Sequence, residues 1–206
     1  MIDGKGYHVP VVLLTGKGLT MGYPFKKTWW IAGDSLLGGC YPGTPDMGGQ
    51  RQMLASLLDM GISCFVNLQE ENETGAGGNT FRDYRPVVAE LARQHNMDVV
   101  VKRFPIRDQS TPDVATMSSI LDYIDEQLEA GRKIYVHCWG GNGRTGTVAG
   151  CWLIRHDITP DDVFKVMKEG RNGREFTREA PENSEQRTFV REWIRNDQKR
   201  SETESG

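Results

Sequence analysis

The feature that most constrains the fold is an alternation of short, β-rich apolar runs with segments of helical periodicity. Three such runs, at residues 62–68, 98–104 and 133–138, are separated by amphipathic stretches. Strands joined by helical crossovers lie parallel, with helices on both faces of the sheet. The sequence therefore predicts an α/β fold with a mostly parallel central sheet of four to five strands flanked by helices on both faces.

The other elements follow from turn residues and helical spacing. A Gly- and Pro-rich segment predicts either a short hairpin or edge strands at 29–33 and 38–43. Thr111 is predicted to cap a helix that has Pro112 at its first position, Asp113 in its first turn and its end at Gly131. Thr159 is predicted to cap a later helix. Helical spacing predicts the remaining helices at 46–60, 84–95, 144–156, 160–169 and 182–197.

Composition excludes several classes of protein. No run approaches the roughly 18 apolar residues that a membrane span needs, and the N-terminal stretch lacks the basic region of a secretory signal. Twenty-five basic against 28 acidic residues give a net charge of −3, which argues against a nucleic-acid partner held by bulk charge. The four cysteines, Cys40, Cys64, Cys138 and Cys151, form no CxxC pair and no metal-ligand spacing. We expect a reduced cytoplasmic protein with no metal site and no cofactor.

The segment IYVHCWGGNGRTGT carries the clearest chemistry. Cys138 ends a predicted strand and Arg144 begins a predicted helix, with Trp139, Gly140, Gly141, Asn142 and Gly143 between them. Glycines let successive backbone amides point inward, forming an anion-binding nest at a helix N-terminus. Amide dipoles and a guanidinium favour the thiolate of a cysteine there, and an arginine binds two phosphate oxygens at once. Thr145 is placed to donate its hydroxyl to the sulfur.

These residues resemble a known family. HCWGGNGRT matches the HCxxGxxR[ST] signature of cysteine-dependent protein tyrosine and dual-specificity phosphatases, and PIRDQSTPD is similar to the PIxDxxTPD segment of the kinase-associated phosphatase group. APENSEQRTFVREW is similar to compact bacterial members. The resemblance runs from about residue 29 to 194 and is strongest over 104–150. It implies a protein tyrosine phosphatase-like fold with Cys138 as nucleophile, Arg144 as phosphate ligand and Asp108 as general acid.

The resemblance also sets the expected boundaries. Residues 29–198 are predicted to be the catalytic domain, residues 1–28 an N-terminal extension without an assigned role, and residues 199–206 a polar tail. The substrate site is predicted to comprise the backbone and side chains from Trp139 to Arg144.

Asp108 is also what the reaction requires, because the departing alkoxide or phenoxide must receive a proton. Asp113 is the rival acid, although its place at a helix start explains it without catalysis. His137 is predicted to fix the geometry of the loop, and Gln186 either positions the hydrolytic water or caps a neighbouring backbone. Trp139 either forms part of the cleft wall or packs on the following helix.

Two charged segments remain. Arg171, Arg174 and Arg178 either bind a second phosphate or an acidic flank of the substrate, or form a solvated basic loop, which is the commoner arrangement. Glu70, Glu71 and Glu73 lie beside a glycine run after a predicted strand. They are predicted to form a mobile acidic lip of the cleft that disfavours acidic residues near the phosphate, with a solvated loop as the alternative.

The expected activity is hydrolysis of phosphoproteins through a phosphocysteine intermediate, acting on phosphotyrosine and on phosphoserine or phosphothreonine. The partner is therefore a phosphorylated protein substrate. The alternatives are the same chemistry on a phosphoinositide, an inositol phosphate or an RNA 5′-triphosphate, a phosphopeptide-binding pseudophosphatase, and a rhodanese-type sulfurtransferase. The five residues between Cys138 and Arg144 carry no charge, which favours a singly phosphorylated group.

Overall fold

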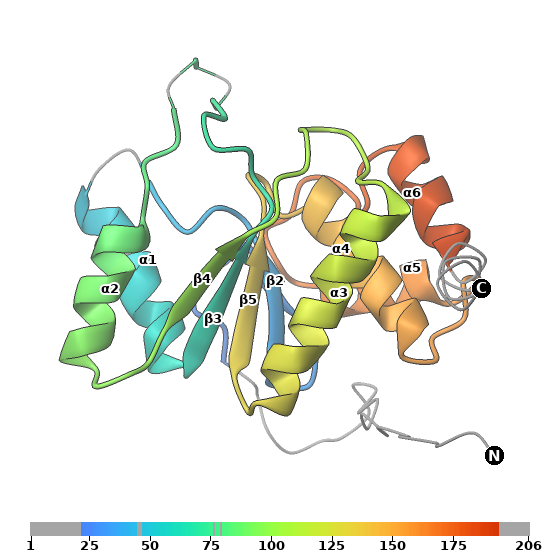
Figure 1. Ribbon diagram of the computed structural model, residues 1–206. Coiled ribbons are helices and arrows are strands. Elements are labelled where there is room, and N and C mark those ends of the chain that lie inside the picture. Colours follow the sequence, from blue (N-terminus) through green and yellow to red (C-terminus); the bar gives the residue numbers. More distant parts are fainter. Residues whose placement is uncertain (1–21, 45–46, 76, 79, 194–206) are drawn as a thin grey trace.

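A computed structural model describes residues 22–44, 47–75, 77–78 and 80–193 (Figure 1). Its five strands form one sheet in the order β1–β2–β5–β3–β4. The strands are β1 (Thr28–Ala32), β2 (Leu36–Gly39), β3 (Ile62–Asn67), β4 (Val100–Arg103) and β5 (Lys133–His137). All neighbours are parallel except β1, which pairs with β2 in the predicted antiparallel hairpin. The predicted mostly parallel sheet is confirmed.

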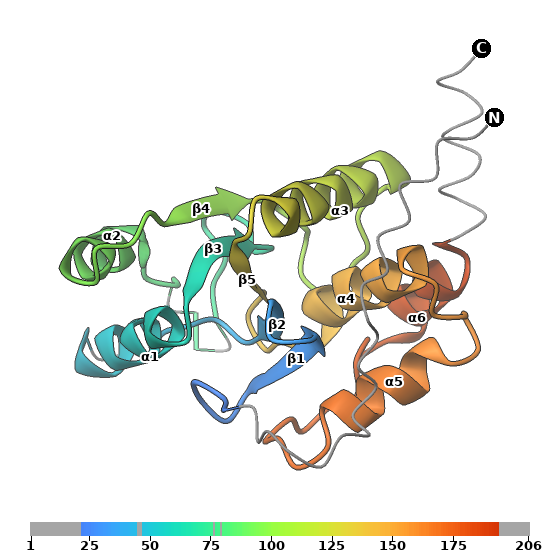
Figure 2. The same ribbon diagram turned by 90° about the horizontal axis from the view of Figure 1, so that it is seen from below.

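Helices cover both faces of this sheet. One face carries α1 (Met47–Asp59) and α2 (Arg85–Gln94). The other carries α3 (Val114–Glu129), α4 (Gly143–Arg155), α5 (Val163–Gly170) and α6 (Ser184–Arg191). Seen from below, the two groups of helices lie on opposite sides of the twisted sheet (Figure 2). Each group shares its own apolar core with the strands, and β5 contributes side chains to both.

The central helix is α4, which is buried without interruption from Gly143 to Ile154. Cys151 lies within it and Cys64 within β3, and both thiols are buried in the same core. An amphipathic helix has a polar face, whereas a helix that is apolar on most sides must be enclosed by others. The sequence 144–156 predicted such a helix, and its burial fixes the N-terminal turn of α4 rigidly at the edge of the sheet.

Three helix starts differ from the sequence-based expectation. Asp113, not Thr111, is the N-cap of α3, and its side chain accepts a hydrogen bond from the backbone N–H of Thr116. Helix α5 starts after Asp162, because Thr159 and Asp162 close a turn through their side chains. Asn183 caps α6 through the backbone N–H of Gln186. Residues 1–21 and 194–206, which include much of the predicted N-terminal extension, the polar tail and the end of the last predicted helix, lie outside the described residues.

Within the part of the chain that the structure describes, no helix has both the length and the apolar character that crossing a membrane requires.

The capping contact of Asp113 gives a stability prediction. Replacing Asp113 by Ala removes the acceptor for the Thr116 amide and should lower the free energy of unfolding by about 1 kcal/mol. Thr111→Ala removes no cap and should cost less, because the hydroxyl of Thr111 only contacts the exposed Glu185 carboxylate at 3.3 Å. Urea unfolding of both variants measures the difference. Equal losses would place the cap at Thr111.

Candidate active site

The loops that follow β3, β4 and β5 meet at one edge of the sheet. The carboxyl ends of parallel strands lie together, and ligands bind beyond them in such folds. The loop after β3 carries Glu73, the loop after β4 carries Asp108, and the loop after β5 leads into Arg144 at the start of α4. All three loops rise from the same edge of the sheet in Figure 1.

Arg144 joins these three loops. Its side chain is only 1% exposed, and its Nη1 and Nη2 donate to the two carboxylate oxygens of Glu73 at 2.5 and 2.8 Å. Nη1 also donates to the carbonyl of Ile106 at 3.0 Å, and Nη2 lies 2.9 Å from the carboxylate of Asp108. The buried Nε has no hydrogen-bond partner among the described residues. The edge formed by Nε and Nη2 thus carries a donor that no described residue uses, and it is called the open edge below.

Charges around the guanidinium raise the pKa of Arg144. Burial is the largest single effect and by itself would lower this pKa. The carboxylate of Glu73 and the sulfur of Cys138 together raise it by more. The side chain is therefore a permanent cation inside the protein. A buried charge of this kind is tolerated only when it is paired and hydrogen-bonded.

Glu73 supplies that pairing, which corrects the prediction of a mobile acidic lip. Its side chain is 7% exposed, accepts from Gln69 Nε2 at 3.1 Å and faces Arg144 rather than solvent. Burial alone would raise the pKa of Glu73. The hydrogen bonds and charge of Arg144 lower it by a larger amount, so the net shift is downward. Of the three acidic residues in this loop, only Glu70 and Glu71 are exposed, which is what an acidic lip of the cleft would require.

The loop from Cys138 to Arg144 closes tightly against β2. Cys138 is 3% exposed at the end of β5. Gly141 has φ +72°, and a Cβ there would lie 2.6 Å from the carbonyl carbon of Gly39. At Gly143 a Cβ would lie 2.7 Å from a carboxylate oxygen of Glu182. Gly141 therefore requires glycine, because both its φ and the nearby backbone exclude a side chain, whereas a Cβ at Gly143 would displace only the ends of flexible side chains.

The N-terminus of α4 is left open for an anion. Asn142 is the N-cap residue, but its side chain makes no capping hydrogen bond and instead accepts from Arg171 Nη2 at 2.5 Å. Uncapped amides at a helix N-terminus attract negative charge. Together with the open edge of Arg144, they form an anion site beside Cys138.

His137 lies beneath this loop. Tyr84 Oη lies 2.7 Å from its Nε2, and the carbonyl of Cys138 lies 3.2 Å from its Nδ1. Burial lowers the pKa of His137 to about 3, so the ring is neutral at physiological pH. A carbonyl oxygen only accepts, so Nδ1 carries the proton and Nε2 accepts from Tyr84. The ring thereby links the cysteine backbone to the start of α2.

Thr145, Gln186 and Trp139 surround the loop. The hydroxyl of Thr145 donates to the carbonyl of Gly39 at 3.4 Å, so its contact with the sulfur stays a prediction. The buried Gln186 donates to the carbonyl of Ser110 at 3.2 Å and lies against Gly143, between the acid loop and α4. Trp139 is 37% exposed and packs edge-on against Phe81 rather than on the following helix.

The basic segment after α5 is not the solvated loop that its composition suggests. Arg171 is buried beside Asn142, and Arg174 donates to the carbonyls of Phe25 and Thr28 at 2.6 and 2.8 Å. Only Arg178 is largely exposed, with a 3.2 Å contact to Glu182.

Comparison with known proteins agrees with this geometry. A family model described as "Polymorphic toxin system, DSP-PTPase phosphatase" matches residues 43–158, more than half of the chain. The chain belongs to this family. The sequence motif predicted this family of dual-specificity and tyrosine phosphatases.

Individual relatives are more distant. Cyclin-dependent kinase inhibitor 3 of Sus scrofa is 35% identical over 77 residues, which cover 36% of each chain. Phosphatidylglycerophosphatase and protein-tyrosine phosphatase 1 of Rattus norvegicus is 24% identical over 166 residues, covering 79% of this chain and 78% of the relative. The crystal structure of Tk-PTP in the active form superposes with a TM-score of 0.63 at 23% identity over 82% of this chain and 97% of that one. The chain spans about a third to two thirds of the length of the first curated relatives it matches.

Two residues named from the sequence could not be told apart from their neighbours there. Glu73 is one of three similar acids in a glycine-rich loop, and only its burial against Arg144 distinguishes it. Arg171 stands in a basic run in which each arginine looks alike. In the described residues, no group of three or more His, Cys, Asp or Glu side chains is arranged to hold a metal ion.

The pairing of Glu73 with Arg144 gives a second prediction. Glu73→Gln leaves a buried guanidinium without its main carboxylate and should lower the free energy of unfolding by about 3 kcal/mol at neutral pH. The matched variant Glu71→Gln, in the exposed part of the same loop, should change it by less than about 0.5 kcal/mol.

The same pairing predicts a pH dependence. The folded state lowers the pKa of Glu73, so the stabilisation is complete above its ordinary value of 4.5 and is lost as the pH falls below that value. The difference in unfolding free energy between wild type and Glu73→Gln should therefore shrink on acidification. Urea unfolding at graded pH measures it, and a constant difference would show that the carboxylate charge is not what stabilises the loop.

Proposed function

We propose that this chain hydrolyses phosphomonoesters of proteins, phosphotyrosine and also phosphoserine or phosphothreonine, through a phosphocysteine intermediate on Cys138. The observation that carries the proposal is the contact of Asp108 with the open edge of Arg144. It places a carboxyl group on the same guanidinium that would bind the phosphate, next to the loop of Cys138.

Substrate binding then has a defined geometry. A phosphate dianion accepts from Nε and Nη2 of Arg144, which is a bidentate pairing that only a guanidinium offers. It thereby replaces Asp108 on Nη2, while Glu73 keeps the opposite edge. The backbone amides of the Cys138 loop and of the first turn of α4 bind the remaining oxygens. Asp108, on a loop and 39% exposed, is freed to face the leaving group.

The reaction follows in two steps. The thiolate of Cys138 attacks phosphorus, the P–O bond to the substrate breaks, and the carboxylic acid of Asp108 donates a proton to the departing oxygen. The Asp108 carboxylate then takes a proton from water, whose oxygen attacks phosphorus as the P–S bond breaks. Inorganic phosphate leaves and the thiolate is restored. Gln186, beside both Gly143 and the acid loop, is placed to orient that water.

A protein substrate is supported by the loop itself. Residues 139–143 carry no charge, which suits one phosphate on an extended chain better than a densely charged headgroup. The printed name of the rat relative joins a phosphatidylglycerophosphatase with a protein-tyrosine phosphatase, so a phospholipid is the second candidate substrate. A non-catalytic phosphopeptide binder has less support, because Cys138, Arg144 and Asp108 are all present and assembled.

The nucleophile is tested by Cys138→Ser. A serine hydroxyl is not ionised at neutral pH, so turnover of phosphotyrosyl peptides should be abolished while their binding persists. Phosphate release and isothermal calorimetry measure the two quantities. The control is Cys151→Ser, in the buried core, which should retain turnover wherever it remains folded. Substantial turnover by Cys138→Ser would contradict the phosphocysteine mechanism.

The general acid is tested by the leaving group. Asp108→Asn cannot donate a proton, so its loss in rate should be greatest on phosphothreonine, smaller on phosphotyrosine and smallest on p-nitrophenyl phosphate, within about 10²–10⁴-fold. Asp113→Asn keeps the helix cap and should treat all three substrates alike. Exchange of these two behaviours would make Asp113 the acid.

A further inference from the structure

The acid loop, residues 104–113, carries Asp108 between β4 and α3. Near its start, the backbone N–H of Ile106 donates to a carbonyl just after β3 at 3.1 Å. At its centre the chain makes a turn, in which the N–H and the hydroxyl of Ser110 donate to the carbonyl of Arg107 at 3.2 and 2.9 Å. Asp108 lies in this turn and is 39% exposed, so burial alone does not determine where its carboxyl group points.

Gln109 follows Asp108 in a backbone conformation that needs support. Its φ is +60°, in the left-handed region that residues other than glycine adopt rarely and at a cost in free energy. Its side chain is exposed, so burial does not account for this conformation. A strained residue persists only where the surrounding structure fixes it. Without such a contact, the turn would relax to a commoner conformation and carry Asp108 with it.

The first turn of α6 supplies this contact. Asn183 Nδ2 donates to the carbonyl of Gln109 at 2.8 Å. Gln186 donates to the next carbonyl of the acid loop at 3.2 Å, and the hydroxyl of Thr111 contacts Glu185 at 3.3 Å. Three consecutive residues of the loop thus bind side chains from a single helical turn.

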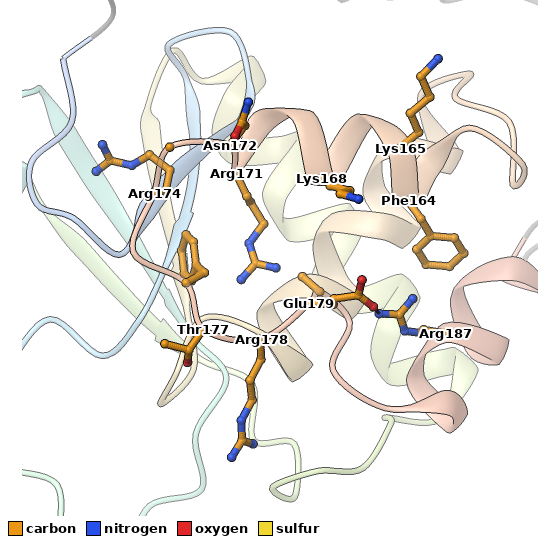
Figure 3. A pocket seen from close by; sticks show the side chains of 13 residues that line it. Phe164, Lys165, Lys168, Arg171, Asn172, Arg174, Thr177, Arg178, Glu179 and Arg187 are labelled. Carbon is orange, nitrogen blue, oxygen red and sulfur yellow. Dashed lines mark hydrogen bonds and ion pairs between the residues drawn. The ribbon is translucent and has the colours of Figure 1, made fainter.

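This turn of α6 is itself firmly placed. The Oδ1 of Asn183 accepts from the N–H of Gln186 at 2.9 Å, so one side chain caps the helix with its oxygen and holds the acid loop with its nitrogen. Arg187 on α6 pairs with Glu179, and Figure 3 shows these two side chains side by side at the edge of a pocket of about 680 Å³. Val190, one turn further along, is fully buried against α4. The helix is therefore a rigid support for the loop.

We infer that Asn183 is a positioning residue for the general acid: its side-chain amide holds the carbonyl of Gln109 and thereby keeps the carboxyl group of Asp108 facing the phosphate site. The inference rests on the proposed function, in which Asp108 is the acid. A proton donor acts only within hydrogen-bond reach of the leaving oxygen. When phosphate replaces Asp108 on Arg144, the ion pair no longer holds the carboxyl group in place. The contact with Asn183 does not use the phosphate ligands, so it can hold the loop at that moment.

The variant Asn183→Ser tests the inference. Serine caps a helix as asparagine does, but it replaces the amide that reaches Gln109 by a shorter hydroxyl. Its kcat should fall about tenfold to a hundredfold on a phosphothreonyl peptide and less than about threefold on p-nitrophenyl phosphate, because a misplaced acid matters most for a basic leaving group. KM should stay within about twofold, since Arg144 and the loop amides are unchanged. An equal loss on both substrates would overturn the inference.

A double variant tests whether the effect passes through Asp108. In an Asp108→Asn background, Asn183→Ser should change kcat less than about twofold, because no acid is left to position. A loss of the same size in both backgrounds would contradict a positioning role.

Two further variants control for charge and for the substitution itself. Asn183→Asp also caps the helix and lacks the amide donor, so it should behave like Asn183→Ser. A loss seen only with Asn183→Asp would trace to its charge and reject the inference. Asn172→Ser makes the same change at an exposed asparagine after α5 and should leave all rates unchanged.

A measurement without substrate separates this inference from the proposed function. Amide relaxation by NMR should give order parameters of about 0.85 for Gln109 and Ser110 in the wild type, and Asn183→Ser should lower them below about 0.6. If the wild type turns over no ester, the proposed function fails, and the order parameters still decide whether Asn183 holds the acid loop. Order parameters that do not change would reject the inference even in an active enzyme.

Discussion

The rest of the site depends on one buried cation, the guanidinium of Arg144. A charge that is 1% exposed must be compensated inside the protein, and Glu73 provides this with two hydrogen bonds. The same guanidinium donates to the carbonyl of Ile106 and contacts the carboxylate of Asp108, so three loops that are distant in sequence meet at one point. The three loops converge because each of them contributes to pairing the charge of Arg144, and not only because their strands end at the same side of the sheet. Because Glu73 and Ile106 use one edge of the guanidinium, the edge at Nε is left for an anion.

The sheet makes this arrangement rigid. Strand β5 lies at its centre and delivers His137 and Cys138 to the edge, and α4 leaves that edge as the most enclosed helix of the fold. Gly141 and Gly143 let the intervening backbone pass close to β2 and to Glu182. A protein interior packs at crystal-like density, so the loop from Cys138 to Arg144, packed between β2 and Glu182, has little room to change its conformation. The anion site is therefore preorganised, which is the condition for stabilising charge that develops during a reaction.

Local sequence patterns predicted the fold and the loop from Cys138 to Arg144. Contacts between side chains far apart in the chain could not be predicted from the sequence. The strands and helices follow from periodicity, and the Cys138 loop from the six-position spacing between Cys138 and Arg144, because both depend on neighbours in the chain. The N-cap of α3 was misplaced by two residues, since Thr111 and Asp113 offer the same capping chemistry. Glu73 could not be distinguished from Glu70 and Glu71, because its partner Arg144 lies 71 positions later in the chain. The structural role of Arg174 does not show in the sequence for a similar reason: its partners, near β1, lie almost 150 residues before it.

These pairings also determine where the protein attracts its substrate. In the empty site, the single charge of Arg144 faces the carboxylates of Glu73 and Asp108, so little positive charge is left over to draw an anion from solution. The positive field near the site must come from elsewhere, and the cations around Arg171 and Lys168 are one described group that can supply it, since Arg171 contacts Asn142 of the Cys138 loop. Fields of this kind raise association rates and fall off with salt. In the proposed mechanism, capture by these cations and recognition by Arg144 are separate tasks: the first depends on long-range attraction, and the second on an exchange of one carboxylate, Asp108, for a phosphate that fits the same edge.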